Sequence, residues 1–192
     1  MGEPERRSDR VLVEQFRAGD REAFTALYRP HFPSVYRFAF YMTGDRTRAG
    51  EITQDVFVWL VHHPGEFDAE RGELGAFLGG VARKFLLRQQ RSERRWIPFD
   101  EAVTPRDGQD ARGNLVSEVE REQEAVQLRQ AIAALPVRYR EAVVLCDLEA
   151  KSYEEAATLL GCAMGTVRSR LHRARELLVR KFQGKKEGLR CL

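Results

Sequence analysis

The chain has 192 residues, of which 43% are hydrophobic and 32% are charged, a balance typical of folded domains and unlike that of a disordered tail. No apolar run approaches the roughly 20 residues that cross a bilayer, and the first residues lack the hydrophobic core of a signal peptide. We therefore expect a cytoplasmic protein without membrane insertion. Its three cysteines and four histidines show no metal-ligand or disulfide spacing, which predicts free thiols, no metal site and no cofactor.

The net charge of +3 is unevenly distributed along the sequence. Residues 97–120 carry six acidic and two basic side chains, together with proline and glycine, and show no sustained periodicity, which is typical of a linker. Apolar residues recur at steps of three and four on both sides of it. The pattern predicts an all-α fold of two small helical domains on a flexible acidic linker: a tail at 1–10, a domain at 11–96, the linker at 97–120, a second domain at 121–182 and a tail at 183–192.

Capping residues and prolines divide the first domain into successive predicted helices. Asp20 is a suitable N-cap, and Pro33 can open a separate helix after it. Asp45 or Thr47 would start the next helix, and a gap that includes Pro64 precedes the last one. The apolar stripes of these helices contain Leu12 and Phe16, then Phe24, Leu27 and Tyr28, then Ile52, Val56, Trp59 and Leu60, and finally Leu74, Leu78, Val81 and Phe85.

The helix after Asp45 combines an apolar stripe with an acidic, polar face. Glu51, Gln54 and Asp55 point away from the stripe in a domain that is otherwise basic. Acidic side chains repel DNA phosphates, so this face is a candidate protein-docking surface, although it could equally be an ordinary solvated face.

The last helix of the first domain has a basic stripe beside its apolar one, formed by Lys84, Arg88, Arg91 and Arg95. Such a stripe can follow the phosphates of DNA. Three aromatic residues lie near it in the sequence, namely Phe67, Phe77 and Trp96. Unpaired bases stack on aromatic side chains, but packing in the core is the competing interpretation for Phe67 and Phe77.

The second domain contains the spacing of a helix-turn-helix. Ser152 and Glu155 form a potential capping box, and Gly161 can end the first helix in a left-handed conformation. The second helix has an apolar stripe of Val167, Leu171, Ala174 and Leu178, which leaves Arg168, Ser169, His172, Arg173 and Arg175 largely outside. A helix that presents arginine in this way can enter the major groove of DNA and contact bases or phosphates.

Four consecutive stretches resemble the extracytoplasmic-function (ECF) class of bacterial sigma factors, the promoter-specificity subunits of RNA polymerase. Similarity to the opening region lies in LVEQFRAGDREAFTALYRPHFPSVYRFAF, and similarity to the core-polymerase-binding helix lies in AGEITQDVFVWL. FDAERGELGAFLGGVARKFLLRQQRSERR is similar to the −10 recognition and melting region, and ALPVRYREAVVLCDLEAKSYEEAATLLGCAMGTVRSRLHRARELL is similar to the −35 recognition domain. The resemblance covers about residues 11–182 in order.

The resemblance implies three binding surfaces and no catalytic residues. One surface binds the clamp helices of the largest polymerase subunit, and a second captures unpaired −10 bases, while a third reads −35 duplex. An anti-sigma factor that masks them is a further implied partner. The implied residues are Glu51, Gln54 and Asp55 for core polymerase; Phe67, Asp68, Arg71, Phe77, Lys84, Arg88 and Arg91 for −10 promoter DNA; and Arg168, Ser169, His172 and Arg173 for −35 promoter DNA.

Two rival functions remain open on the sequence alone. A stand-alone transcriptional regulator could use the same helix-turn-helix, but the first domain shows none of the βα alternation of a ligand-binding or phospho-acceptor domain. A nuclease would need metal ligands, for which Asp45, Glu51, Asp55, His62 and His63 are the available residues. One acidic helix face already accounts for Glu51 and Asp55.

Overall fold

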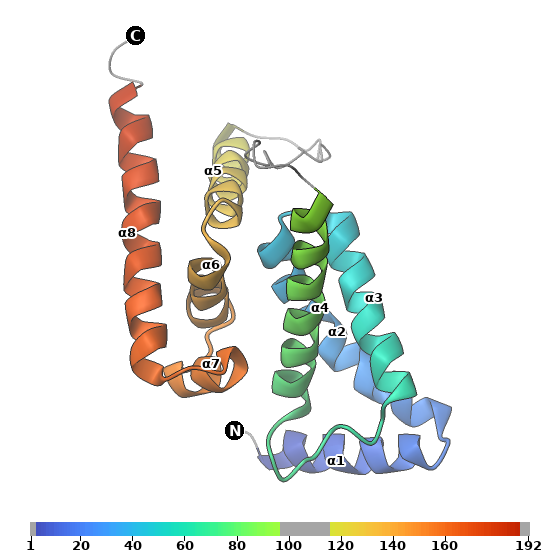
Figure 1. Ribbon diagram of the computed structural model, residues 1–192. Coiled ribbons are helices and arrows are strands. Elements are labelled where there is room, and N and C mark those ends of the chain that lie inside the picture. The colour runs from blue at the N-terminus through green and yellow to red at the C-terminus, as the bar shows by residue number, and fades with distance from the viewer. Residues whose placement is uncertain (1–2, 97–115, 189–192) are drawn as a thin grey trace. The chain divides into compact units, whose positions relative to one another are not determined.

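The computed structural model describes the backbone of residues 3–96 and 116–188 and the side chains of residues 9–90 and 123–182. These parts of the chain are helical and contain no strand, which confirms the predicted all-α fold (Figure 1). The chain divides into two compact units, residues 1–40 with 47–101 and residues 41–46 with 102–192. None of the described helices has the length and apolar character that crossing a membrane requires.

The first unit is built from four helices. They are α1 (Glu3–Arg17), α2 (Arg21–Thr43), α3 (Arg46–His62) and α4 (Leu74–Trp96). Residues 41–43 at the end of α2 group with the second unit. Helices α2, α3 and α4 form a bundle, and α1 lies across one end of it (Figure 1). Asp20 begins α2 as predicted, since its carboxylate accepts hydrogen bonds from the amides of Glu22 and Ala23 at 2.8 and 3.3 Å.

Helix α2 does not break at Pro33, contrary to the sequence prediction, and both Pro30 and Pro33 lie inside it. A proline inside a helix removes one backbone hydrogen bond and is usually unfavourable. Here an aromatic ladder runs through both prolines, with ring centroids 5.1–6.3 Å apart. The ladder also packs on Phe57 of α3, and this tertiary packing offsets the cost of the prolines. Its rings are those of Phe24, Tyr28, Phe32, Tyr36 and Phe40.

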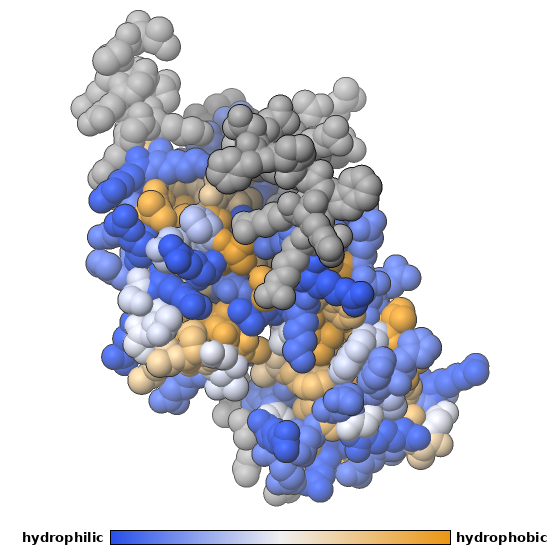
Figure 2. Space-filling model, viewed as in Figure 1, coloured by the Kyte–Doolittle hydropathy of each residue, from blue (hydrophilic) through white to orange (hydrophobic). Residues whose placement is uncertain are grey.

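The remaining stripes of the first unit point inward as the sequence predicts. Leu27, Leu60, Leu74 and Leu78 are completely buried. Hydrophilic side chains dominate the surface on the face shown in Figure 2, with smaller hydrophobic areas between them. The bundle therefore holds its polar faces outward on a rigid core.

The second unit contains a helix-turn-helix on a small helical support. Its elements are α5 (Val116–Ala133), α6 (Val137–Val143), the π-helical turn η1 (Val144–Leu148), α7 (Tyr153–Leu160) and α8 (Met164–Gly188). Helix α8 packs against α6 and α7. Arg140 of α6 donates to the carbonyl oxygens of Ala133 and Leu135, the latter at 3.0 Å, and so caps the carbonyls at the end of α5.

Helices extend into three segments that we expected to be tails or linker, and the predicted domain bounds stay a prediction. Residues 3–10 belong to α1, residues 116–120 belong to α5, and residues 183–188 belong to α8. Acidic residues favour helix N-termini and basic residues favour C-termini, and the sequence places Glu3 and Glu5 at the start of α1 and Lys185 and Lys186 at the end of α8. The linker prediction for residues 97–115 lies outside the described residues.

Candidate nucleic-acid interface

The turn between α7 and α8 has the geometry that the sequence predicts. The Ser152 hydroxyl accepts from the Glu155 amide at 3.2 Å, and the Glu155 carboxylate accepts from the Ser152 amide at 2.7 Å, which completes the capping box. The latter bond lowers the pKa of Glu155. Gly161 ends α7 at φ 62°, in the left-handed region. Helix α7 therefore has fixed ends, and α8 begins in a defined direction.

One side of α8 is buried and the opposite side is exposed. Val167, Leu171 and Ala174 are buried against the rest of the unit, and Leu178 is half-buried. This buried stripe confirms the predicted orientation of the helix. The four residues predicted to read the −35 element, Arg168, Ser169, His172 and Arg173, are all exposed on the N-terminal half of α8.

Neighbouring side chains contact three of these predicted readers. The guanidinium of Arg168 lies over the ring of Tyr153, with the carbon Cζ 5.5 Å from the ring centroid, which is within cation–π range. Arg173 Nη1 lies 2.7 Å from the carboxylate of Glu176, and His172 Nε2 lies 3.4 Å from the same group. The hydrogen bond raises the pKa of Arg173 and lowers that of Glu176.

Sequence reasoning missed Glu176 and Tyr153. The spacing of Glu176 to Arg173 and His172, three and four residues, is the one that brings helical side chains together, and it was visible in the sequence. Arg175, which the sequence places outside the core, has a structural partner. It makes two contacts with the Asp147 carboxylate, at 2.5 and 3.1 Å, and these tie α8 to η1.

In the first unit, α4 presents its basic face to solvent. Lys84 and Arg88 are exposed one turn apart, while Leu74, Leu78 and Val81 on the other side of the helix are buried. The predicted phosphate contact Arg91 belongs to α4, but its side chain lies outside the described residues, as do those of Arg95 and Trp96.

The loop between α3 and α4, residues 63–73, holds three more of the residues predicted to contact −10 DNA, and the fourth, Phe77, lies near the start of α4. Phe67 is only 5% exposed, and its ring centroid lies 5.5 Å from that of Phe77, which in turn is 5.9 Å from Trp59. Asp68 and Arg71 are exposed and form an ion pair at 3.2 Å. Phe67 and Phe77 thus take part in core packing, and the loop carries its charged side chains outside that core.

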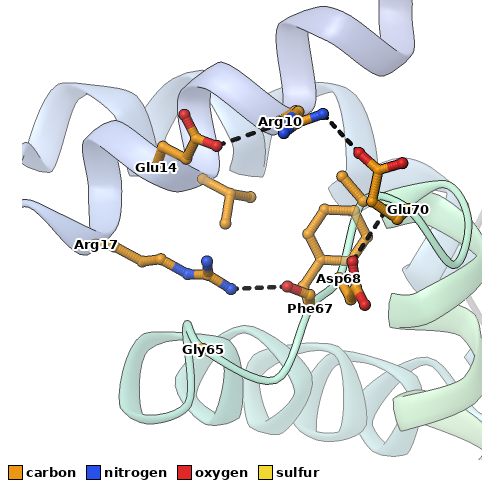
Figure 3. A pocket seen from close by; sticks show the side chains of 9 residues that line it. Arg10, Glu14, Arg17, Gly65, Phe67, Asp68 and Glu70 are labelled. Atoms are coloured by element: carbon orange, nitrogen blue, oxygen red, sulfur yellow. Dashed lines mark hydrogen bonds and ion pairs between the residues drawn. The ribbon is translucent and has the colours of Figure 1, made fainter.

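A cavity of about 320 Å³ lies between this loop and α1 (Figure 3). The sequence did not indicate it, because α1 and the loop are far apart along the chain. Helix α1 contributes residues at positions 10, 13, 14 and 17, which share one helical face. The cavity is lined by Arg10, Val13, Glu14, Arg17, Gly65, Phe67, Asp68, Ala69 and Glu70.

Arginines of α1 hold the loop at this cavity. Arg17 donates from Nε to the carbonyl oxygen of Pro64 and from Nη2 to that of Phe67, both at 2.7 Å. Arg10 forms ion pairs with Glu70 at 2.7 Å and with Glu14 at 3.5 Å. Phe67 therefore lines the cavity beside the guanidinium of Arg17, which binds the backbone carbonyl of Phe67 (Figure 3).

Helix α3 exposes the acidic face that the sequence predicts. Glu51, Gln54 and Asp55 are exposed, whereas Ile52, Thr53 and Val56 are buried. The exposed face continues with Val58 and Val61, which are 46% and 42% exposed. The sequence reasoning passed over these two valines, although their spacing places them on the same face as Glu51 and Asp55. Among the described residues, no group of three or more acidic, histidine or cysteine side chains could hold a metal ion.

Two protein-family models match successive parts of the chain. Residues 27–96 match Sigma-70 region 2, and residues 125–178 match Sigma-70, region 4. The first match contains α3, the 63–73 loop and α4, and the second contains the helix-turn-helix.

Individual relatives agree with these matches. The ECF RNA polymerase sigma factor SigE of Mycolicibacterium smegmatis is 34% identical over 83% of this chain, which spans 63% of that relative's length. The ECF RNA polymerase sigma-E factor of Escherichia coli is 30% identical over 93% of this chain and 96% of its own length. The sigma factor RpoE of Bartonella quintana, solved in complex with the anti-sigma factor NepR, superposes with a TM-score of 0.65 at 26% identity, over 83% of this chain and 96% of that one.

Proposed function

Because this chain belongs to the ECF class of RNA polymerase sigma factors, we propose that it is a promoter-specificity subunit. It binds core RNA polymerase, recognises −35 and −10 promoter elements and promotes DNA opening. The observation that carries the proposal is the exposed arginine face of α8 inside the region 4 match, in a chain that also contains the region 2 match. A stand-alone regulator would need the helix-turn-helix in the region 4 match but not the region 2 match.

The second unit recognises the −35 duplex through α8. Arg168, Ser169, His172 and Arg173 face away from the buried stripe, so the helix can lie in the major groove without unfolding any core contact. Arginine can bind guanine through two hydrogen bonds or bind a phosphate, and serine can accept or donate at a base edge. The histidine ring can also contact a base edge or a thymine methyl group.

The first unit captures an unpaired −10 base between the 63–73 loop and α1. The cavity there is lined by the largely buried ring of Phe67 and rimmed by arginine and carboxylate groups that can bind the polar edge of a base. Asp68 and Arg71 on the exposed side of the loop, and Phe77 behind Phe67, complete the predicted −10 surface. Opening then follows from binding of the displaced base, without bond cleavage.

The exposed basic residues of α4 follow the phosphates next to that base. Replacing Lys84, Arg88 and Arg91 together by alanine is expected to reduce promoter opening and flatten its salt dependence, by roughly 0.7–0.9 in the log–log slope for each phosphate that is no longer neutralised. The measurement is open-complex formation by the holoenzyme across a salt series.

The matched control for this charge removal replaces Arg21 and Arg29, which are exposed on α2, and is expected to leave the slope as in the parent. An unaltered slope for the α4 variant would show that its basic stripe is only a solvated face.

The exposed face of α3 docks on the clamp helices of the largest polymerase subunit. Glu51 and Asp55 supply negative charge, Gln54 supplies hydrogen bonds, and Val58 and Val61 add apolar area on the same face. A mixed acidic and apolar face of this kind fits a basic, partly apolar helical partner.

Reversing Glu51 and Asp55 to lysine is expected to weaken binding to core polymerase, because two favourable charges become repulsive. Titration of labelled core enzyme with the variant measures the affinity, and circular dichroism checks the helical fold. Glu22→Lys, an exposed reversal on α2, serves as the control. Unchanged core affinity after the double reversal would count against this docking face.

Two modest DNA contacts on one polymerase scaffold reinforce each other through effective concentration, which is the physical use of two units on one chain.

The protein acts by binding alone, without catalytic chemistry or a cofactor. It acts in the cytoplasm, where its polymerase is found. An anti-sigma factor is a further partner, by analogy with the RpoE–NepR complex.

Run-off transcription with core polymerase and a random promoter pool tests the proposal. Selective transcripts that depend on this protein are the expected result. A gel shift without polymerase separates the rival, since a stand-alone regulator binds its site alone, whereas a sigma factor binds poorly until it joins the core enzyme. Tight binding without polymerase, together with no transcript in its presence, would contradict the proposal.

A further inference from the structure

The 63–73 loop is held partly by its own hydrogen bonds, such as those from the Glu66 amide to the His63 carbonyl and from the Arg71 amide to the Asp68 carbonyl, both at 3.1 Å, and partly by a side chain outside it. It runs between the end of α3 and the start of α4 without helical structure of its own, and it contains Pro64, Gly65 and Gly72. Gly72 has φ 153°, where residues with a side chain are disfavoured. Backbone carbonyls in such a segment need partners, and a loop that lacks them samples several conformations.

Arg17 supplies two of these partners from a single side chain. Its guanidinium donates to the Pro64 and Phe67 carbonyl oxygens at 2.7 Å each. The planar fork of a guanidinium fixes the two acceptors relative to each other, and charge-assisted bonds are stronger than neutral ones. Arg17 therefore sets the path of the chain from Pro64 to Phe67, the residue that lines the cavity.

Helix α1 is itself firmly attached to the bundle. Val13 is 2% exposed, and the ring of Phe16 lies 5.2 Å from that of Phe24 in α2. Asp9 Oδ2 contacts His31 Nε2 at 3.0 Å, and both side chains are largely buried. Arg17 thus extends from a rigid helix, which allows it to hold a loop in place.

The second arginine at the cavity, Arg10, is held more weakly. Its ion pair with Glu70 joins side chains that are 55% and 76% exposed, and exposed pairs contribute little to order. The two arginines of α1 that line the cavity are therefore unequal, because Arg17, although exposed as well, binds two backbone carbonyls, one of them in a partly buried contact.

We propose that Arg17 is a positioning residue for −10 recognition: it holds the Phe67 side of the loop in the conformation that captures the unpaired base. This inference rests on the proposed function of the loop. Arg17 acts through the loop carbonyls, so its loss weakens the preference for one base at the captured position. A direct phosphate contact would instead affect all sequences alike.

The test uses the full-length protein in holoenzyme with a library randomised at −10 and a fixed −35 element. Arg17→Ala is expected to lower the preference at the captured position roughly ten-fold, because it removes two charge-assisted hydrogen bonds. Arg17→Lys keeps the charge but cannot hold both carbonyls in a fork, so it is expected to recover only part of the preference. Arg29→Ala, an exposed arginine of the same unit, is the control and is expected to match the parent.

Two further measurements separate positioning from other roles. Hydrogen exchange at residues 64–71 is expected to be faster in Arg17→Ala while the rest of the first unit exchanges as in the parent. Probes with an abasic site at the captured position are expected to bind parent and variant equally, because neither protein can make the base contact with such a probe. A uniform loss over all −10 sequences with a smaller salt slope would identify a phosphate contact and overturn the proposal.

The same library separates this inference from the proposed function. If Asp68→Ala and Arg71→Ala change the −10 preference and Arg17→Ala does not, the positioning role is wrong and the loop remains the reader. If none of the three changes the preference, the loop is not the reader and the proposed −10 surface fails. If Arg17→Ala does not fold, Arg17→Lys decides, and a parental −10 preference in that variant overturns the proposal.

Discussion

Single alanine substitutions at Arg168 and Arg173 are expected to change −35 selection, and at least one of them to relax the preference at a single position by roughly 10- to 100-fold. The reason is geometric. The buried stripe of Val167, Leu171 and Ala174 turns both arginines outward on the N-terminal half of α8, which is the part of a recognition helix that contacts base edges. Losing a two-bond contact to guanine removes discrimination at that base pair alone.

The two arginines start from different surroundings, and this affects how each reaches DNA. Arg168 rests on the Tyr153 ring of α7, a contact that holds the guanidinium without using its hydrogen-bond donors. Arg173 is paired with Glu176, in an exposed ion pair of the kind that solvent and salt weaken. Arg168 is therefore positioned with its donors available, whereas Arg173 would have to leave Glu176 to contact a base or a phosphate.

Selection of −35 sequences from a random library measures these effects, with Arg168→Ala, His172→Ala and Arg173→Ala each in holoenzyme. A phosphate contact weakens all sequences alike, whereas a base contact changes one position. Lys181→Ala removes an exposed charge farther along the same helix and serves as the control. If all three variants keep the parent preference at every position, this face of α8 does not read the promoter.

The helix-turn-helix could be predicted from sequence because each of its parts has a local signal. Ser152 and Glu155 have capping-box spacing, Gly161 marks the left-handed turn, and the stripe beginning at Val167 sets the orientation of α8. Each of these signals depends only on residues that lie within four positions of one another, so a single sequence is enough to detect it. The same holds for the polar face of α3.

The features that the sequence did not predict depend on contacts between distant residues. Pro33 is tolerated inside α2 because the aromatic ladder packs on Phe57, which lies on another helix. Arg17 binds backbone carbonyls of a loop that starts 46 residues later in the chain, at His63. Every residue has a backbone carbonyl, so the residue types in the loop do not indicate which carbonyl accepts the bond. Glu176 is the exception, since its spacing to Arg173 was visible and its pairing follows from helix geometry.

Leu171→Ala is expected to lower the free energy that resists opening of the second unit by about 2–5 kcal/mol, the usual cost of removing a buried leucine side chain. Leu171 is 2% exposed and lies on the side of α8 that packs against α6 and α7. The substitution leaves a cavity under the recognition helix, which the surrounding structure fills only in part.

Native-state hydrogen exchange on peptides from residues 153–182 measures this change, because it reports the opening of one unit in a chain that has two. Arg168→Ala, three residues earlier on the exposed face, is the matched control and is expected to stay within about 0.5 kcal/mol of the parent. The two variants distinguish the packing side of α8 from its DNA-facing side. Leu171→Ala is expected to weaken binding to every −35 sequence, because it destabilises the helix itself. Arg168→Ala is expected to keep the fold and to change only sequence recognition. A loss below about 1 kcal/mol in Leu171→Ala would mean that the stripe does not fix the direction of α8, and the assignment of its outer face to DNA would lose its basis.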